Sequence, residues 1–386
     1  MTLIHIQSLQ KSELLKTDLS SARHIGLDCE AAGFHRYSDR LCLLQLTTER
    51  GTYVIDPLGF DPAELIRNAL ENPEVSVMMH SADFDLRLLR RDLGIRVTGL
   101  FDTQIAAQLL GEEGLGLASL LESRFGLKLS KKYQRADWAE RPLSDAMLNY
   151  AANDTRYLAR LTDVLKGELA EAGRLEWVQE ECLALESASG AVTEPELLED
   201  PVVRIKGARH LSLRQLAELR KALAWRDEIA RDRDRALFRV IGDKPLVEAL
   251  AARPRSVSDL TNVKGFPTKL ATEEGRDLLS RIKAVAHLDE SELQPYPNPR
   301  RRGPGRPSPQ IITLADTLKT VRNRKAEELG LPRGTLLANT VVLEIARAAP
   351  KTLEELSDVP GMRRWKAKLL GPVSYTHLTL PTILLV

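Results

Sequence analysis

The sequence predicts a layered α/β or α+β domain followed by two all-helical units. The first third of the chain interleaves short apolar runs with longer stretches of helical periodicity, whereas the chain beyond residue 210 is helical almost throughout. The helical part also contains the same series of helical segments twice, in the same order. A length of 386 residues, with 43% hydrophobic and 28% charged residues, agrees with two or three soluble domains and excludes a disordered or fibrous chain.

Short apolar runs in the first third predict the strands of a mixed sheet. The neighbouring runs are close enough to pair as hairpins, so part of the sheet should be antiparallel. Helices with a regular apolar face should pack on it. The expected strands are residues 25–27, 41–46, 52–55, 75–79 and a short one ending at Phe101, and the expected helices are 62–71, 84–93 and 103–110.

One long helix is expected over residues 145–172. Apolar residues from Leu148 to Leu169 recur at a spacing of three, four or seven, which is the period of one helix face. Ser144 supplies a start signal, because a serine hydroxyl is a good N-cap. This helix should complete the layered domain, which we expect to end near residue 185.

The remaining chain reads as an internal repeat of two compact helical units. Helices are expected over 211–231, 244–252, 256–260 and 272–286, and a second passage with the same order covers 314–370. Chance similarity between helical segments is the alternative. The shared signature is Arg253-Pro254-Arg255-Ser256 with Val263 and Gly265, against Ala349-Pro350-Lys351-Thr352 with Val359 and Gly361.

These patterns divide the chain into six parts. They are a layered domain (1–185), a linker (186–210), a first helical unit (211–290), a linker rich in Pro and Arg (291–312), a second helical unit that we expect to be truncated (313–372), and a tail that we expect to be non-native (373–386). The tail departs from the charged helical pattern before it, and residues 373–382 resemble the translation of a transposon sequencing adapter.

Charge is unevenly distributed along the chain. Residues 1–210 hold 24 Lys and Arg against 33 Asp and Glu, a net charge of −9, whereas residues 211–372 hold 31 against 21, a net charge of +10. The basic half is a candidate for holding a polyanion, and a solvated surface is the alternative. In the linker, Arg300, Arg301, Arg302 and Arg306 favour a semi-rigid spacer that attracts phosphates. Insertion of Gly305-Arg306-Pro307 into a minor groove is the alternative.

Cysteine usage and hydropathy indicate the compartment. Cys29, Cys42 and Cys182 cannot form a disulfide framework, and the sequence has no CxxC pair. A reducing environment fits best. The sequence also has no secretory signal pattern and no apolar run long enough to span a membrane. We therefore expect a cytoplasmic protein with no membrane or disulfide partner.

Acidic side chains that could act together occur at three places. At two of them, local geometry puts a pair of side chains on one face of a strand or of a helix. Asp28 and Glu30 follow an apolar run, and residues i and i+2 of a strand share a face. Asp83 and Asp85 open a helix, where capping is the simpler explanation for either acid. Tyr150 and Asp154 stand one helical turn apart. Together they match the chemistry of phosphodiester hydrolysis with two Mg²⁺ or Mn²⁺ ions, because hard divalent ions prefer oxygen ligands.

These motifs resemble those of ribonuclease D, in the tyrosine-bearing branch of the DEDD exonuclease superfamily. The helical repeats resemble HRDC domains. The resemblance implies a ribonuclease H-like exonuclease domain with a mixed sheet, followed by two all-α HRDC domains. The matching segments are LDCE (27–30), LCLLQL (41–46), HSADFD (80–85), FDT (101–103), KKYQRADWAERPL (131–143), YAAND (150–154) and WRDEIARDRDRALFRVIGD (225–243).

The resemblance also assigns roles to individual residues. Asp28 would bridge two metal ions, Glu30 and Asp154 would complete the first site, and Asp85, rather than Asp83, would hold the second. Tyr150 would orient the attacking water, because a phenol with an ordinary pKa near 10 is a poor base. The catalytic set is therefore Asp28, Glu30, Asp85, Tyr150 and Asp154, of which the four carboxylates are the metal ligands.

The segment before Tyr150 is a candidate for substrate contacts. Lys131, Lys132, Tyr133 and Gln134 could meet the phosphates and bases of a 3′ strand. We interpret Trp138 as a packing residue and Asp102 as a helix cap.

The expected function is a metal-dependent 3′–5′ exoribonuclease. The resemblance implies tRNA 3′ maturation or stable-RNA processing on RNA with a free 3′ end. Separately, we expect the protein to be a monomer. A non-catalytic RNA-binding adaptor and a DNA 3′–5′ exonuclease are the alternatives. The complete set of carboxylates argues against an adaptor, which we would expect to have lost at least one of them.

Overall fold

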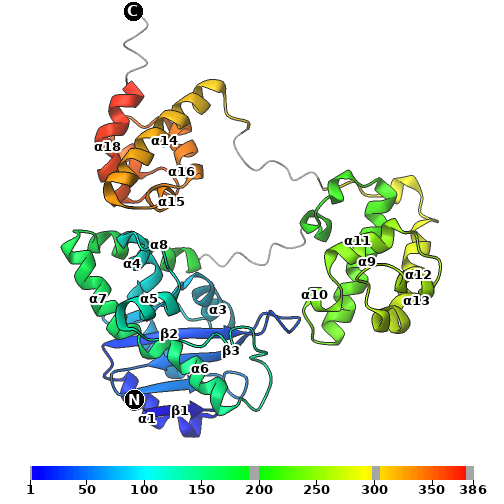
Figure 1. The fold of residues 1–386 in the computed structure, drawn as a ribbon, viewed down its shortest axis with the longest axis horizontal. Coiled ribbons are helices and arrows are strands. Elements are labelled where there is room, and N and C mark those ends of the chain that lie inside the picture. Colours follow the sequence, from blue (N-terminus) through cyan, green and yellow to red (C-terminus); the bar gives the residue numbers. More distant parts are fainter. Residues whose placement is uncertain (1, 191–199, 298–304, 380–386) are drawn as a thin grey trace, which may run out of the picture.

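The computed structural model describes residues 2–190, 200–297 and 305–379. A six-stranded mixed sheet forms the centre of the N-terminal domain, in the order β1-β4-β3-β2-β5-β6 (Figure 1). The strands are β1 Thr2–Ile6, β2 His24–Ala31, β3 Leu41–Thr47, β4 Gly51–Ile55, β5 Ser76–Met79 and β6 Leu100–Asp102.

The prediction of a mixed sheet is confirmed. Strands β2, β3 and β4 pair antiparallel, whereas β2, β5 and β6 pair parallel. All five predicted strands are present. The sequence patterns missed β1, which lies at the sheet edge parallel to β4. A short strand with one neighbour buries little side-chain area and leaves only a weak alternating pattern.

Helices cover both faces of the sheet. Helix α1 (Glu13–Leu19) lies against the face that carries Leu27, Leu46 and Tyr53, and the Tyr53 hydroxyl donates to Asp18. Helix α6 (Asp145–Arg156) lies against the opposite face, over Leu43 and Val54. The other helices of this domain are α2 Ala63–Leu70, α3 Asp83–Leu93, α4 Thr103–Leu110, α5 Leu117–Phe125, α7 Leu158–Glu171 and α8 Leu175–Gly190.

The predicted helix over residues 145–172 is two helices in the structure. Helix α6 ends at Arg156 and α7 begins at Leu158, with Tyr157 between them at φ −107° and ψ 0°. The two helices bury their apolar faces in different cores, since Ala151 packs with the sheet residues under α6, and Leu165 packs in the main core. The apolar spacing continues through the junction, so the sequence carries no signal for the break.

Among the described residues, α9 to α18 form two units with the same order of helices, which confirms the predicted repeat. The first has α9 Leu213–Asp232, α10 Leu237–Val240, α11 Asp243–Ala251, α12 Val257–Thr261 and α13 Thr268–Val285. The second has α14 Pro309–Leu329, α15 Arg333–Leu336, α16 Asn339–Ala348, α17 Leu353–Ser357 and α18 Arg364–Thr379.

A buried arginine holds the same position in each unit. Arg226 donates from Nη1 to the Ile241 carbonyl and to the Asp243 carboxylate, at 3.2 and 2.6 Å. Arg322 donates from Nη1 to the Leu337 carbonyl and to the Asn339 side chain, at 2.9 and 2.8 Å. Left-handed backbone also recurs, at Arg253 and Ala349 and at Gly265 and Gly361.

The predicted tail is helical in its first part, because α18 continues to Thr379. Residues 380–386 lie outside the described residues, as does most of the arginine-rich part of the second linker, at 298–304. The origin of the tail stays a prediction. Within the part of the chain that the structure describes, no helix is both long and apolar enough to cross a membrane.

The second helical unit packs on the N-terminal domain through α8. The rings of Trp177 and Trp365 stack with centroids 4.4 Å apart. Glu180 accepts hydrogen bonds from the backbone N–H groups of Arg364 and Trp365, and Glu181 pairs with Lys366 at 2.7 Å. In Figure 1 this unit lies beside α4 and α8, whereas the first unit approaches the loop after β2 through α10.

Candidate active site

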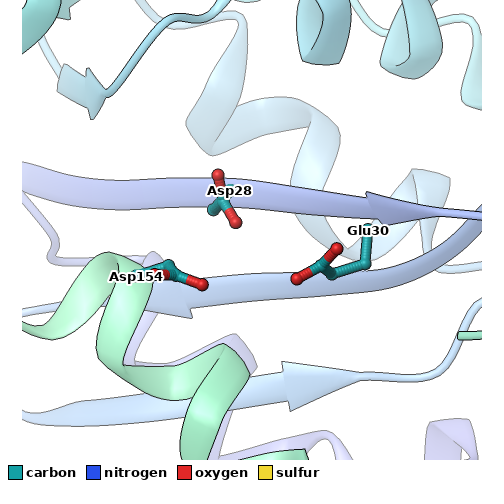
Figure 2. A group of neighbouring side chains, drawn as sticks. All are labelled: Asp28, Glu30 and Asp154. Carbon is teal, nitrogen blue, oxygen red and sulfur yellow. The ribbon is translucent and has the colours of Figure 1, made fainter. Parts of the chain in front are cut away.

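Three of the predicted carboxylates converge between strand β2 and helix α6. One carboxylate oxygen from each of Asp28, Glu30 and Asp154 lies within 4.8 Å of the other two. Figure 2 shows Asp28 and Glu30 extending from β2 and Asp154 extending from α6 toward them. The alternation of side chains along β2 places Asp28 and Glu30 on the face that α6 covers. The sheet and the helix therefore assemble the cluster from positions far apart in the sequence.

A close approach of α6 to the sheet sets the position of Asp154. A Cβ atom on Gly26 would lie 2.9 Å from the Thr155 carbonyl oxygen, so this position of β2 requires glycine. The hydroxyls of Thr47 and Thr155 lie 2.7 Å apart in a buried hydrogen bond. These contacts fasten α6 to the sheet at the turn that carries Asp154.

The fourth predicted carboxylate, Asp85, enters from the first turn of α3. Its residue is only 7% exposed, and its charge raises the pKa values of Asp28 and Glu30, so the four carboxylates share one electrostatic environment. Asp83, which the sequence analysis set aside, pairs with Arg87 at 2.6 Å on the exposed side of α3. The structure thus brings Asp85 to the cluster and leaves Asp83 out of it.

Asp102 holds the start of α3 as well as the start of α4. Its side chain caps α4 by accepting from the N–H groups of Gln104 and Ile105, which confirms the predicted cap. The same carboxylate accepts from Ser81 at 3.1 Å and from Ala82 at 2.8 Å, directly before α3 begins. Asp102 therefore positions the turn that carries Asp85.

Burial and mutual repulsion raise the pKa values of the whole cluster. Burial is the largest cause at every position, followed at Asp28 by the charges of Asp85, Asp154 and Glu30. The pKa of Asp28 is raised well above its ordinary value, and that of Glu30 rises to about 9. The pKa values of Asp85 and Asp154 each rise to about 7. Holding all four ionised at neutral pH therefore costs free energy unless a cation joins them.

The donor set fits divalent metal ions. All four side chains offer carboxylate oxygens, which are the ligands that Mg²⁺ and Mn²⁺ prefer. Among the described residues, no Lys, Arg or His forms an ion pair with Asp28, Glu30, Asp85 or Asp154. Asp28, Glu30 and Asp154 are half-buried, so their oxygens remain accessible to a ligand. Metal ions would supply the positive charge that this cluster lacks.

Tyr150 lies one turn before Asp154 on α6. Its pKa is raised, first by burial and then by the charges of Asp154, Glu30 and Asp28, so the phenol keeps its proton. The ring packs against Tyr133 and Trp138, with centroids 5.8 and 6.1 Å away. Trp138 is 2% exposed, which confirms its interpretation as a packing residue.

The predicted substrate segment lies next to Tyr150. Tyr133 is half-buried against the Tyr150 ring, and the Lys132 ammonium lies 5.1 Å from the centre of the Tyr133 ring. Lys131, Lys132 and Gln134 are exposed. Their place at the edge of the cluster suits a role in substrate binding, which stays a prediction.

Sequence reasoning missed two residues near the cluster. Gln45 pairs with Asp28 across β2 and β3, is fully buried, and has no hydrogen-bond partner for either amide atom among the described residues. One polar residue within an otherwise apolar strand was the available signal. Arg141 anchors the segment before α6 by donating to Asp56 at 2.6 and 2.8 Å and to the Trp138 carbonyl at 2.6 Å. Because Asp56 is distant in sequence, no local pattern indicated this contact.

Comparison with known proteins places these features in context. The family described as 3′-5′ exonuclease matches residues 3–170, and the HRDC domain family matches residues 213–282 and 313–373. The ribonuclease D of Shewanella sp. (strain ANA-3) is 34% identical over 263 residues, which cover 68% of this chain and 67% of that protein. The ribonuclease D of Acidiphilium cryptum (strain JF-5) is 30% identical and covers 95% of this chain and 90% of that protein.

Solved structures agree with the fold. The crystal structure of Escherichia coli RNase D, described as an exoribonuclease involved in structured RNA processing, has a TM-score of 0.66 and 25% sequence identity. The match covers 98% of this chain and 99% of that chain. A protein from Bifidobacterium adolescentis has a TM-score of 0.79 at 23% identity over 97% of this chain, which shows a shared fold.

Proposed function

Because the chain belongs to the ribonuclease D family of 3′–5′ exoribonucleases, we propose that it shortens RNA from the 3′ end with two divalent metal ions. The single observation that carries this proposal is the convergence of Asp28, Glu30 and Asp154, with Asp85 beside them and with no basic partner among the described residues. Clustered carboxylates without a counter-charge suit the binding of hard cations.

The four carboxylates would hold the metal ions in the arrangement implied by the family resemblance. Asp28 would contact both ions, Glu30 and Asp154 would complete the first site, and Asp85 would hold the second. When bound, two Mg²⁺ or Mn²⁺ ions supply the Lewis acidity that activates water and stabilises the leaving oxygen.

Tyr150 orients the attacking water in this proposal. Burial and the neighbouring carboxylates raise its pKa, so the hydroxyl remains protonated and offers a hydrogen bond rather than a base. Packing against Tyr133 and Trp138 restricts the ring to one position. The chain thereby supplies orientation, and the metal site supplies the acidification of the water.

The proposed substrate is RNA with a free 3′ end, and tRNA precursors are the proposed physiological class. Lys131, Lys132, Tyr133 and Gln134 would contact the 3′ strand next to the cluster. The basic C-terminal half would hold the body of a structured RNA. The whole protein would act as a monomer in the cytoplasm, where such precursors are processed. The name of the E. coli relative, which refers to structured RNA processing, supports this choice.

A degradation assay tests the proposal. RNA and DNA oligonucleotides of one sequence, each with a 3′-hydroxyl or a 3′-phosphate, are incubated with Mn²⁺ or Mg²⁺ and with a chelator as control. We expect stepwise shortening of 3′-hydroxyl RNA that the chelator abolishes. Tight binding of intact RNA in the presence of metal would favour the adaptor alternative, and preferential shortening of DNA would favour the DNA exonuclease.

A further inference from the structure

An exposed cluster of aromatic and arginine side chains lies where the first HRDC unit meets the exonuclease domain. We call it the joint patch and define it as Phe34, Arg135, Phe238 and Arg239. The Phe34 and Phe238 rings have centroids 5.4 Å apart. The Arg135 and Arg239 guanidinium carbons lie 5.8 and 4.9 Å from the centre of the Phe34 ring. The exonuclease domain contributes Phe34 and Arg135, and helix α10 contributes Phe238 and Arg239.

Backbone contacts hold the two halves of the joint patch together. Arg239 donates from Nε to the Phe34 carbonyl at 2.7 Å, and the Ala236 N–H donates to the His35 carbonyl at 3.1 Å. The Tyr37 hydroxyl also donates to Asp227 of α9 at 3.0 Å. Figure 1 shows the loop after β2 extending toward α10. The patch is therefore a built feature of this junction.

The aromatic rings remain accessible even though they contact each other. Phe34 is 43% exposed and Phe238 is 53% exposed. The two exposed rings are in contact and so form a contiguous aromatic patch, and contiguous apolar patches, unlike single exposed side chains, mark interaction sites. Two guanidinium groups already lie over the Phe34 ring, so the more exposed Phe238 ring is the surface that a planar group could cover.

The two arginines of the joint patch are free to meet an anion. Among the described residues, neither Arg135 nor Arg239 has a carboxylate within ion-pair distance, and both side chains are exposed. Neighbouring arginines of the same junction are paired, as Arg36 pairs with Asp137 at 2.8 Å and Arg231 with Asp227 at 2.7 Å. The patch thus combines two exposed rings with two uncompensated positive charges.

A continuous set of contacts connects the joint patch to the candidate active site. Tyr133 packs against Tyr150, and Arg135 follows two residues later on the same segment. Phe34 follows Glu30 closely along the chain, in the loop after β2. Two short stretches of chain therefore link the patch to the elements of the active site, and the patch itself lies against the first HRDC unit.

The second HRDC unit docks on the exonuclease domain without an aromatic residue and an arginine at the positions equivalent to Phe238 and Arg239. Its helix α15 corresponds to α10 and places Gly334 and Thr335 where α10 has Phe238 and Arg239. Thr335 accepts a hydrogen bond from Gln108 of the exonuclease domain at 2.9 Å. Both units turn the equivalent short helix toward the exonuclease domain, and α15 begins with the exposed Arg333, but only α10 places an aromatic ring beside an arginine.

We propose that the joint patch binds single-stranded RNA on the 5′ side of the nucleotides in the active site. A base stacks on the exposed ring of Phe238, and backbone phosphates lie against Arg135 and Arg239, which are held over the Phe34 ring. This proposal rests on the proposed function, since it takes RNA as the substrate. It assigns the first HRDC unit a direct part in guiding the 3′ strand, in addition to holding the body of the RNA.

Substrate length separates this role from a purely structural one. We compare wild type and Phe238→Ala on a single-stranded RNA 20-mer, which is long enough to reach the patch, and on a tetramer, which occupies only the active site. The ratio of kcat/KM for the 20-mer to that for the tetramer should fall about tenfold, because losing one stacked base weakens binding by that order. Phe238→Trp should restore the ratio, since it keeps a stacking surface.

Leu237→Ala serves as the matched control. Leu237 lies on the same helix and is 39% exposed, but it offers neither an aromatic ring nor a charge. The ratio should be unchanged in this variant. In Arg135→Gln, the slope of log KM against log salt for the 20-mer should become shallower by about 0.7, as expected for the loss of one phosphate contact to a single strand. Equal losses on both substrates in Phe238→Ala, or no loss on the 20-mer, would overturn the proposal.

A binding measurement keeps this inference separate from the proposed function. The full-length protein is mixed with an RNA 20-mer that carries 2-aminopurine at successive positions from the 3′ end, in the presence of a chelator. Stacking should quench the fluorescence of an internal 2-aminopurine in wild type, and Phe238→Ala should relieve this quenching. If Phe238→Ala leaves the quenching intact, the proposed RNA binding by the joint patch is overturned. Wild type that degrades neither RNA but shows the quenching would overturn only the proposed function.

Discussion

Replacing Asp85 with asparagine should stabilise the metal-free protein at pH 8. Asp85 is 7% exposed, and burial followed by the charge of Asp102 raises its pKa from 3.8 to about 7. A rise of that size corresponds to about 4 kcal/mol of destabilisation by the ionised carboxylate. Asp85 also raises the pKa values of Asp28 and Glu30, so its neutralisation relieves part of their cost as well. We therefore expect Asp85→Asn to raise the free energy of unfolding by about 2 to 4 kcal/mol.

The stabilisation should depend on pH in a defined direction. The pKa of Asp85 is higher in the folded protein than in the unfolded chain. Below about pH 4 the carboxyl is protonated in both states, so the wild-type residue costs nothing there. The cost grows as the pH rises to about 7 and is constant above that value. The advantage of the asparagine variant should therefore be largest at pH 8 and nearly absent at pH 4.

Differential scanning calorimetry of the full chain with a chelator at pH 8, 6 and 4 measures this effect. Asp83→Asn is the matched control, because Asp83 lies on the same turn but is exposed and paired with Arg87. It should change stability by no more than about 0.5 kcal/mol. Adding Mn²⁺ should stabilise wild type more than Asp85→Asn, since the variant keeps the first-site carboxylates but lacks the proposed ligand of the second ion. A destabilised Asp85→Asn at pH 8, or a gain that does not depend on pH, would refute the reasoning.

Four other outcomes follow from the structure. Asp28→Asn should abolish RNA cleavage, because it removes a metal ligand and not a phosphate contact. Its RNA affinity in a filter-binding assay should stay within about twofold of wild type. Loss of folding or of RNA binding would contradict this role. Tyr150→Phe should lower kcat by about 10- to 100-fold, since it removes only the hydroxyl that orients water. The metal concentration needed for half-maximal activity should change little. A rise in that concentration as large as the fall in kcat would assign Tyr150 to metal binding. Gly111→Ala should weaken the docking of the second HRDC unit on the exonuclease domain, because the new Cβ would lie 2.3 Å from the Gly330 carbonyl oxygen. Hydrogen exchange in α15 should then increase. Unchanged exchange would show that this contact is not needed for docking. Deleting residues 211–386 should weaken RNA binding and flatten its salt dependence while short oligonucleotides are still degraded; unchanged salt dependence would show that the basic excess is only surface charge.

Much of the candidate site could be predicted because it depends on short-range spacing. Asp28 and Glu30 share a strand face, and Tyr150 and Asp154 share a helix face, so the sequence alone indicates both pairs. The preference for Asp85 over Asp83 came from the family resemblance, and the structure places Asp85 near the cluster through the contacts of Asp102 with the turn before α3. Gln45 and Arg141 escaped notice because their significance depends on neighbours from other strands and loops.

By itself, the sequence determined five of the six described strands, the internal repeat and the chemical character of the site, because periodicity and spacing encode local structure. Only the tertiary structure decided that the predicted long helix ends at Arg156 and resumes at Leu158, since its two halves pack in different cores. Only the tertiary structure also decided where each HRDC unit meets the exonuclease domain. The stack of Trp177 on Trp365 and the contact of Phe34 with Phe238 join residues that are far apart in the chain, and no local pattern specifies such pairs.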